Sequence, residues 1–115
     1  MSTGITNSNA ESDSGGLVLI DTVTLTTGYS SNGRSLMSTY FPSYAANNAL
    51  WAIIAKNNKS QEINAFYYAA GSVVNVNKAV GQVLRKNGLD DGNYSLSISA
   101  GTTLELWSID FDDLL

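Results

Sequence analysis

The side chains that could do chemistry in this chain are hydroxyls, amides and carboxylates, because the sequence contains no histidine and no cysteine. Those two residue types supply most of the bases that activate nucleophiles and most of the ligands of transition metals. The segment 28–33, Gly-Tyr-Ser-Ser-Asn-Gly, misses the Gly-x-Ser-x-Gly spacing of a serine hydrolase by one residue. No histidine exists to activate Ser30 or Ser31. We therefore interpret this segment as a loop.

Carboxylates could support two other kinds of chemistry. Glu62, Glu105, Asp90 and Asp91 could supply the acid pair of a glycosidase, but a small single domain has little material for the cleft that such a pair needs. Calcium favours clustered oxygens, such as those of Asp90 and Asp91 or of the aspartates in 110–113. The glycine, spacing and closing glutamate of an EF-hand are missing from both. We expect a protein that is not an enzyme and that holds no cofactor or metal.

Charge and hydropathy exclude further classes of partner. The 115 residues carry a net charge of −4, and only 14% of them are charged. Nucleic acid is therefore not an expected partner, because phosphate binding needs clustered lysine and arginine. No apolar run approaches the length of a membrane span, and residues 1–10 have neither the basic region nor the apolar core of a secretory signal. We expect synthesis in the cytoplasm and no membrane contact.

Aromatic rings and amides are the side chains best suited to contact a ligand. Flat sugar faces stack on rings, and asparagine offers paired donors and acceptors to hydroxyl groups. Trp51 and Trp107 lie in apolar strand patterns, so we expect them to fill the core. The candidates for contact with a ligand or partner are three tyrosines better suited to exposed contacts, Tyr29, Tyr40 and Tyr44, and three asparagines expected in loops, Asn32, Asn57 and Asn58.

Short alternating runs of apolar and β-branched residues predict an all-β domain. We expect strands over 17–27, 35–41, 49–55, 61–70, 73–76, 94–99 and 102–111, with 49–55 and 61–70 forming a hairpin. Segment 77–87 has helical spacing but contains Gly81, so a short helix and an irregular strand both remain open. The alternation changes phase near Trp107, which predicts a β-bulge there. The expected organisation is a flexible arm over 1–16, an antiparallel β-sandwich over 17–111 and an acidic tail over 112–115.

The run Asp90-Asp91-Gly92-Asn93-Tyr94 resembles the Asp-x-Gly-x-Tyr corner of immunoglobulin-like sandwiches. It is also similar to the Leu-x-x-Gly-x-Tyr-x-Leu step of many bacterial and viral β-sandwich modules. This resemblance implies an immunoglobulin-like or jelly-roll fold. It also implies that Asp90, Gly92 and Tyr94 form a structural corner, with the tyrosine hydrogen-bonded back across the preceding loop. The cysteine and tryptophan framework of immunoglobulins is missing.

Two predicted strands are apolar on both of their faces. Residues 49–55 have no polar side chain at all, and residues 66–70 are nearly as apolar on both faces. Both strands therefore need other parts of the protein packed on each face. A helix over 77–87 could provide this cover, and a second subunit could do so equally well. The low charge favours a subunit, and the interface residues would be Trp51, Ile53, Phe66 and Tyr68.

The chain resembles accessory proteins of phage virions, such as head decoration proteins, head fibres and tail receptor-binding modules. The resemblance lies in its small size, its many uncharged polar residues and its N-terminal arm. This resemblance implies a non-enzymatic structural or adhesive component of the virion, with copies of itself and other virion proteins as partners. A surface glycan is a further expected partner if the chain is instead a carbohydrate-binding module that uses its loop tyrosines. A third hypothesis is a small acidic inhibitor or immunity-type protein that covers a basic surface with Asp110, Asp112 and Asp113.

Overall fold

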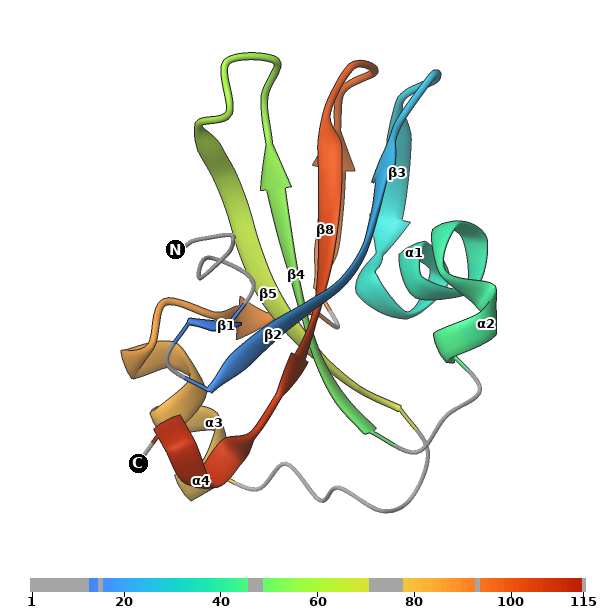
Figure 1. The fold of residues 1–115 in the computed structure, drawn as a ribbon. Coiled ribbons are helices and arrows are strands. Elements are labelled where there is room, and N and C mark those ends of the chain that lie inside the picture. The colour runs from blue at the N-terminus through green and yellow to red at the C-terminus, as the bar shows by residue number, and fades with distance from the viewer. Residues whose placement is uncertain (1–12, 15, 46–48, 71–77, 93, 115) are drawn as a thin grey trace.

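A computed structural model of the chain describes residues 13–14, 16–45, 49–70, 78–92 and 94–114 (Figure 1). The strands are β1 (Asp13–Ser14), β2 (Leu17–Thr24), β3 (Tyr29–Asn32), β4 (Ala49–Lys56), β5 (Glu62–Ala70), β6 (Asp90–Asp91), β7 (Ser95–Ile98) and β8 (Thr103–Ile109). The helices are α1 (Gly33–Tyr40), α2 (Pro42–Ala45), α3 (Lys78–Lys86) and α4 (Phe111–Leu114). None of these helices is long and apolar enough to cross a membrane.

The strands form one large sheet and one small one. The six-stranded sheet has the order β1-β2-β8-β4-β5-β6, and β3 pairs with β7 in a two-stranded sheet. Neighbouring strands are antiparallel except β5 and β6, which run parallel with Phe66 opposite Asp90. The expectation of a β-rich domain is confirmed, but the large sheet is mixed and the described chain also contains short helices.

The predicted hairpin is present as β4 and β5. Leu50 lies opposite Ala69 and Ile53 opposite Phe66, and the register shifts once, between Ala55 and Lys56. Strand β8 pairs with the other edge of β4, so β4 lies inside the sheet with neighbours on both sides. Apolar residues on both faces of β4 agree with that position, because a strand buried on both faces needs no polar side.

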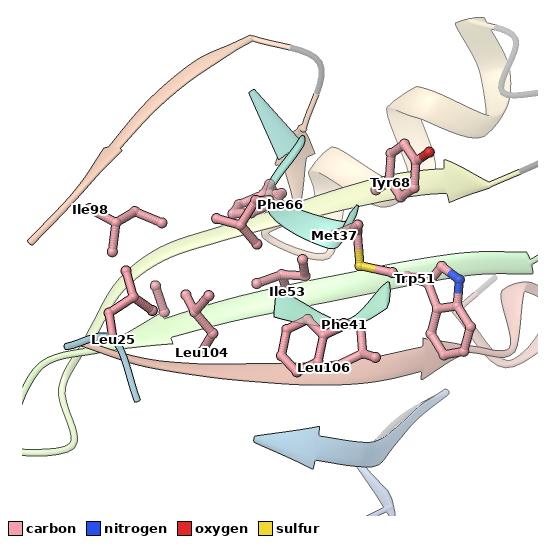
Figure 2. Close-up of a cluster of buried hydrophobic side chains, with 12 residues drawn as sticks. Leu25, Met37, Phe41, Trp51, Ile53, Phe66, Tyr68, Ile98, Leu104 and Leu106 are labelled. Carbon is pink, nitrogen blue, oxygen red and sulfur yellow. The ribbon is translucent and has the colours of Figure 1, made fainter. Parts of the chain in front are cut away.

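A first core lies on one face of the large sheet and is covered by α1, α2 and the β3–β7 pair (Figures 1 and 2). Its buried residues are Leu25, Leu36, Met37, Phe41, Trp51, Ile53, Ala55, Phe66, Tyr68, Ile98, Leu104 and Leu106. A second core lies on the opposite face, against α3 and α4. Its buried residues are Leu50, Ala52, Tyr67, Leu84, Leu89 and Trp107, and Phe111 and Leu114 of α4 pack against them.

The two-sided strands are therefore covered from within the chain. Trp51, Ile53, Phe66 and Tyr68, the expected subunit interface, all lie in the first core, where none is more than 8% exposed. Segment 77–87, whose conformation the sequence left open, contains helix α3, and this helix supplies the cover on the other face. These side chains are thus not available to a second subunit, because the chain's own helices already bury them.

Residues 35–40 lie in helix α1 and Phe41 is its C-cap, so the strand predicted over 35–41 is wrong. Helix α1 begins after Asn32, whose side-chain oxygen accepts a hydrogen bond from the Ser35 N–H at 3.0 Å, as an N-cap residue does. Leu36 and Met37 then face the first core from adjacent positions on one side of the helix. The run Leu-Met-Ser-Thr-Tyr-Phe fits helical spacing better than strict alternation.

The predicted bulge in 102–111 lies instead in the neighbouring strand. Leu104 and Leu106 of β8 face the first core, while Trp107 and Ile109 face the second, as regular alternation from 104 to 109 requires. The pairing of β2 with β8 shifts between Leu19 and Asp21. The apolar residues of β8 change parity because both faces of the strand are buried.

The remaining predictions fall at the ends of the chain and in one connection. The predicted strand over 73–76 lies outside the described residues, and so does most of the expected arm over 1–16. Within that arm, β1 pairs with β2, Asp13 opposite Val18 and Ser14 opposite Leu17. At the other end, the expected acidic tail overlaps α4, whose Leu114 packs against the second core.

Candidate functional site

The Asp-Asp-Gly-Asn-Tyr motif lies where three backbone segments meet. The Gly92 N–H donates a hydrogen bond to the Tyr67 carbonyl at 2.9 Å, and the Gly33 N–H donates to the Gly92 carbonyl at 2.6 Å. A β-carbon on Gly92 would lie 2.5 Å from the Tyr67 carbonyl oxygen and 2.8 Å from Cδ2 of Phe66. Glycine is therefore required at 92, because the backbone and the Phe66 ring of β5 approach too closely for any side chain, and a β-carbon on Gly33 of α1 would in turn meet the Gly92 backbone.

The tyrosine of the same motif points into solvent. Its side chain is 70% exposed, the highest value among the exposed large hydrophobic residues of the described chain. A corner tyrosine packs its ring across the preceding loop, and a ring this exposed does not. In the predicted corner, Gly92 joins the segments, Asp90 pairs with Phe66 at the sheet edge, and Tyr94 presents a ring at the surface.

The pKa of Tyr67 clearly departs from its ordinary value. Burial raises the pKa of Tyr67, the negative charge of Asp91 raises it further, and Arg85 opposes this shift. The ring lies in the second core and reaches α3, where a β-carbon on Gly81 would be 3.6 Å from the phenol oxygen. The phenol therefore stays protonated at neutral pH and above, so it can donate a hydrogen bond but cannot act as a base.

The three tyrosines predicted to contact a ligand are half-buried at the border of the first core. Tyr29 and Tyr40 pack edge to face with ring centres 5.8 Å apart, and the Tyr29 hydroxyl donates to the Asn32 carbonyl at 2.7 Å. The structure thus brings Tyr29, Asn32 and Tyr40 together where β3 leads into α1. Tyr44 packs edge to face on Trp51 at 5.7 Å. Each ring has a partner within the fold, which limits the flat area left for a sugar.

Asn57 and Asn58, the other predicted contact residues, lie at a groove between two loop tips. This tip groove has a volume of about 270 Å³ and is lined by Asn57, Asn58, Ile63, Ser99, Ala100, Gly101 and Thr102. Asn57 holds the shape of the β4–β5 loop: its Oδ1 accepts from the Lys59 and Gln61 N–H groups at 2.9 and 3.0 Å. Asn58 is exposed. The lining contains two amides, two hydroxyls, the apolar side chains of Ile63 and Ala100, and no charged group, which suits an uncharged ligand with both polar and apolar parts.

The outer edge of β2 is the third surface feature, and sequence patterns did not identify it. Strand β1 pairs only with Leu17 and Val18, so from residue 19 to residue 24 the described chain pairs with β2 on the β8 side alone. Val18 and Ile20 expose 40% and 38% of their surface. The Thr22 N–H donates to Oδ1 of Asp21 at 2.8 Å, so one backbone donor of this β2 edge is already satisfied. The β-branched run 17–27 indicated a strand but not its place at the margin of the sheet.

Neither a search for metal-binding clusters nor comparison with known proteins identifies a further functional site. Within the described residues no three acidic side chains gather closely enough to hold a metal ion. No protein family, curated protein or solved structure matches the chain.

Proposed function

We propose that the protein is a non-enzymatic structural or adhesive component of a larger assembly, of the kind formed by the accessory proteins of phage virions: head decoration proteins, head fibres and tail receptor-binding modules. The observation that carries this proposal is the β2 edge, where backbone groups on the margin of the large sheet lie beside the exposed side chains of Val18 and Ile20. In the same proposal, the β3–β7 pair is the second layer of an immunoglobulin-like or jelly-roll sandwich.

A sheet edge is an efficient contact for another chain. An added strand gains main-chain hydrogen bonds along the edge, and the alternating side chains provide specificity. Proteins usually protect such edges with charges, bulges or very short strands. The β2 edge carries the first two protections, a bulge between Leu19 and Asp21 and the Asp21 carboxylate on the Thr22 N–H. These features leave the apolar stretch at Val18 and Ile20 accessible to a specific partner and discourage indiscriminate pairing.

The proposal is tested by measuring the native mass of the protein from the cells or particles that contain it and identifying the chains that co-purify. We expect a complex for the wild-type protein and its loss in Ile20→Lys, because a charged side chain disfavours pairing at an edge. Thr39→Lys is the control, since it adds the same charge at an exposed position on helix α1 and not on a strand. A wild-type protein that is always monomeric, or a complex that persists unchanged in Ile20→Lys, would contradict the proposal.

A carbohydrate-binding module is the second candidate, and the tip groove favours it. An uncharged groove lined by amide and hydroxyl groups offers hydrogen bonds to a sugar without the cost of burying a charge. Glycan-array binding that is lost in Asn58→Ala and kept in Tyr29→Phe would support this site. Binding that depends on Tyr29 or Tyr44 and not on Asn58 would place the sugar on the tyrosines, and no binding at all would exclude this candidate.

A further inference from the structure

The charges of this protein are gathered on two neighbouring helices. The chain has a net charge of −4, yet three of its six basic residues, Lys78, Arg85 and Lys86, lie on the nine-residue helix α3. Beside α3 lies α4, which carries Asp112 and Asp113 (Figure 1). All five side chains are exposed. In a chain with so few charges, this places exposed opposite charges on two adjacent helices.

Among the described residues, no ion pair joins a basic side chain of α3 to an aspartate of α4. The ion pair found among the described residues joins Lys56 to Glu105 at 3.2 Å, on the strands of the large sheet. Between α3 and α4 lies a hollow of about 440 Å³, lined by Val83, Lys86, Asn87 and Leu114. Of the five charged residues, Lys86 lines this hollow, together with the aliphatic side chains of Val83 and Leu114, and the other four lie elsewhere on the two helices.

We propose that a second copy of this chain docks on the α3–α4 surface across a two-fold axis. In such an interface the same patch is used twice, so the basic α3 of each copy meets the acidic α4 of the other. A polyanion does not fit, because the aspartates beside the basic residues would repel it. A basic partner is repelled by α3 in the same way. A surface with both charges side by side is complementary to itself.

Each part of the surface has a separate role in this contact. The hollow at Val83 and Leu114 supplies apolar area, which provides the non-directional part of the binding free energy. The exposed charges fix the relative orientation of the copies and increase the rate of encounter. Because exposed charges are screened by salt, dimerisation is expected to weaken as ionic strength rises.

This inference rests on the proposed function, because it identifies one contact by which copies of the chain build the assembly. It uses charged residues other than the exposed side chains of the β2 edge, although α4 packs against Gly16 just before β2. Contacts between copies at α3 and α4 leave Val18 and Ile20 for a different chain, so the two surfaces can be tested independently.

The experiment is charge reversal followed by mixing, measured by sedimentation equilibrium of the full-length protein. Lys78→Glu/Lys86→Glu makes both helices acidic, and Asp112→Lys/Asp113→Lys makes both basic. We expect each double variant to raise the dimer dissociation constant by about tenfold or more, and an equimolar mixture to recover wild-type affinity as a mixed dimer. Lys59→Glu is the control, since Lys59 is an exposed lysine on the β4–β5 loop and should leave the constant unchanged. Circular dichroism establishes that each variant is folded.

Three results would overturn the inference: a wild-type protein that stays monomeric at high concentration, reversed variants that dimerise like the wild type, or a mixture that does not recover. Native mass spectrometry of the assembly then separates the two proposals. A complex that tolerates both reversals but is lost in Ile20→Lys removes the α3–α4 contact and leaves the proposed function standing. A protein that is monomeric everywhere removes both.

Discussion

Replacing Gly92 by alanine tests the close approach of three backbone segments. The added β-carbon would lie 2.5 Å from the Tyr67 carbonyl oxygen and 2.8 Å from Cδ2 of Phe66. Backbone and a packed ring cannot yield as a flexible side chain does, so the β6–β7 connection must move away from β5. That movement breaks or weakens two hydrogen bonds, from Gly92 to Tyr67 and from Gly33 to Gly92.

The expected cost follows from what is lost. A buried backbone group left without its partner costs about 1–3 kcal/mol, and there are two such bonds at this junction. Forcing an extra carbon into a packed site adds about 1–3 kcal/mol. We expect Gly92→Ala to lower the free energy of unfolding by about 3 kcal/mol or more, a large part of the roughly 5–15 kcal/mol that stabilises a typical domain.

Gly88→Ala is the matched control. Gly88 has a positive φ of 85° and no atom within 4 Å of a β-carbon built on it, so its replacement strains only the local backbone. That strain costs about 1–2 kcal/mol. Urea denaturation, followed by the fluorescence of Trp51 and Trp107, reports on both cores in one experiment. If Gly92→Ala is no more destabilising than Gly88→Ala, the close approach at Gly92 is wrong.

Three further predictions test the second core, the buried phenol and the hairpin loop. Leu84→Ala on α3 should destabilise by about 2–5 kcal/mol, because Leu84 is fully buried against the sheet, whereas Gln82→Ala on the exposed side of the helix should stay within about 0.5 kcal/mol in the same denaturation assay. The raised pKa of Tyr67 contributes stability that is complete below pH 10 and is lost as pH rises through the higher folded-state pKa. Absorbance at 295 nm should show one phenol that titrates later than the others and is missing in Tyr67→Phe. Identical titration curves for the two proteins would contradict this prediction. Asn57→Ala should lower the unfolding free energy by about 1 kcal/mol through the two backbone donors that it leaves without an acceptor, and Asn58→Ala should be neutral.

Elements that depend on local patterns could be predicted from the sequence. The β4–β5 hairpin follows from two apolar runs around the polar segment 56–60, and its register places Trp51 opposite Tyr68. Helix α1 was missed although local evidence for it exists. Asn32 is a good N-cap residue, and apolar side chains at 36, 37 and 40 fit one face of a helix. The segment was instead predicted as a short strand ended by Pro42, because a segment this short carries a weak periodicity signal.

The candidate site could be predicted only in part, because exposure depends on tertiary packing. Residues Asn57 and Asn58 were expected in a loop, and they line the tip groove. Tyr29 and Tyr40 were also expected to be exposed to a ligand, but neighbouring elements pack against their rings. No local pattern distinguishes Tyr94, whose ring is exposed, from these two, because the difference depends on how the chain leaves the junction at Gly92.

Cover of the two-sided strands by the chain's own helices changes where evidence for an assembly must be sought. The faces of β4 and β5 carry no information about partners, since α1 and α2 cover one side and α3 the other. A low charge fraction then cannot be explained by a hidden sheet face. Among the described residues, the features left outside include the margin of the sheet at Ile20 and the charged surface of α3 and α4. Neither feature benefits a monomer. An open strand edge promotes unwanted pairing with other chains, and nearby opposite charges that form no ion pair add little to the stability of the monomer.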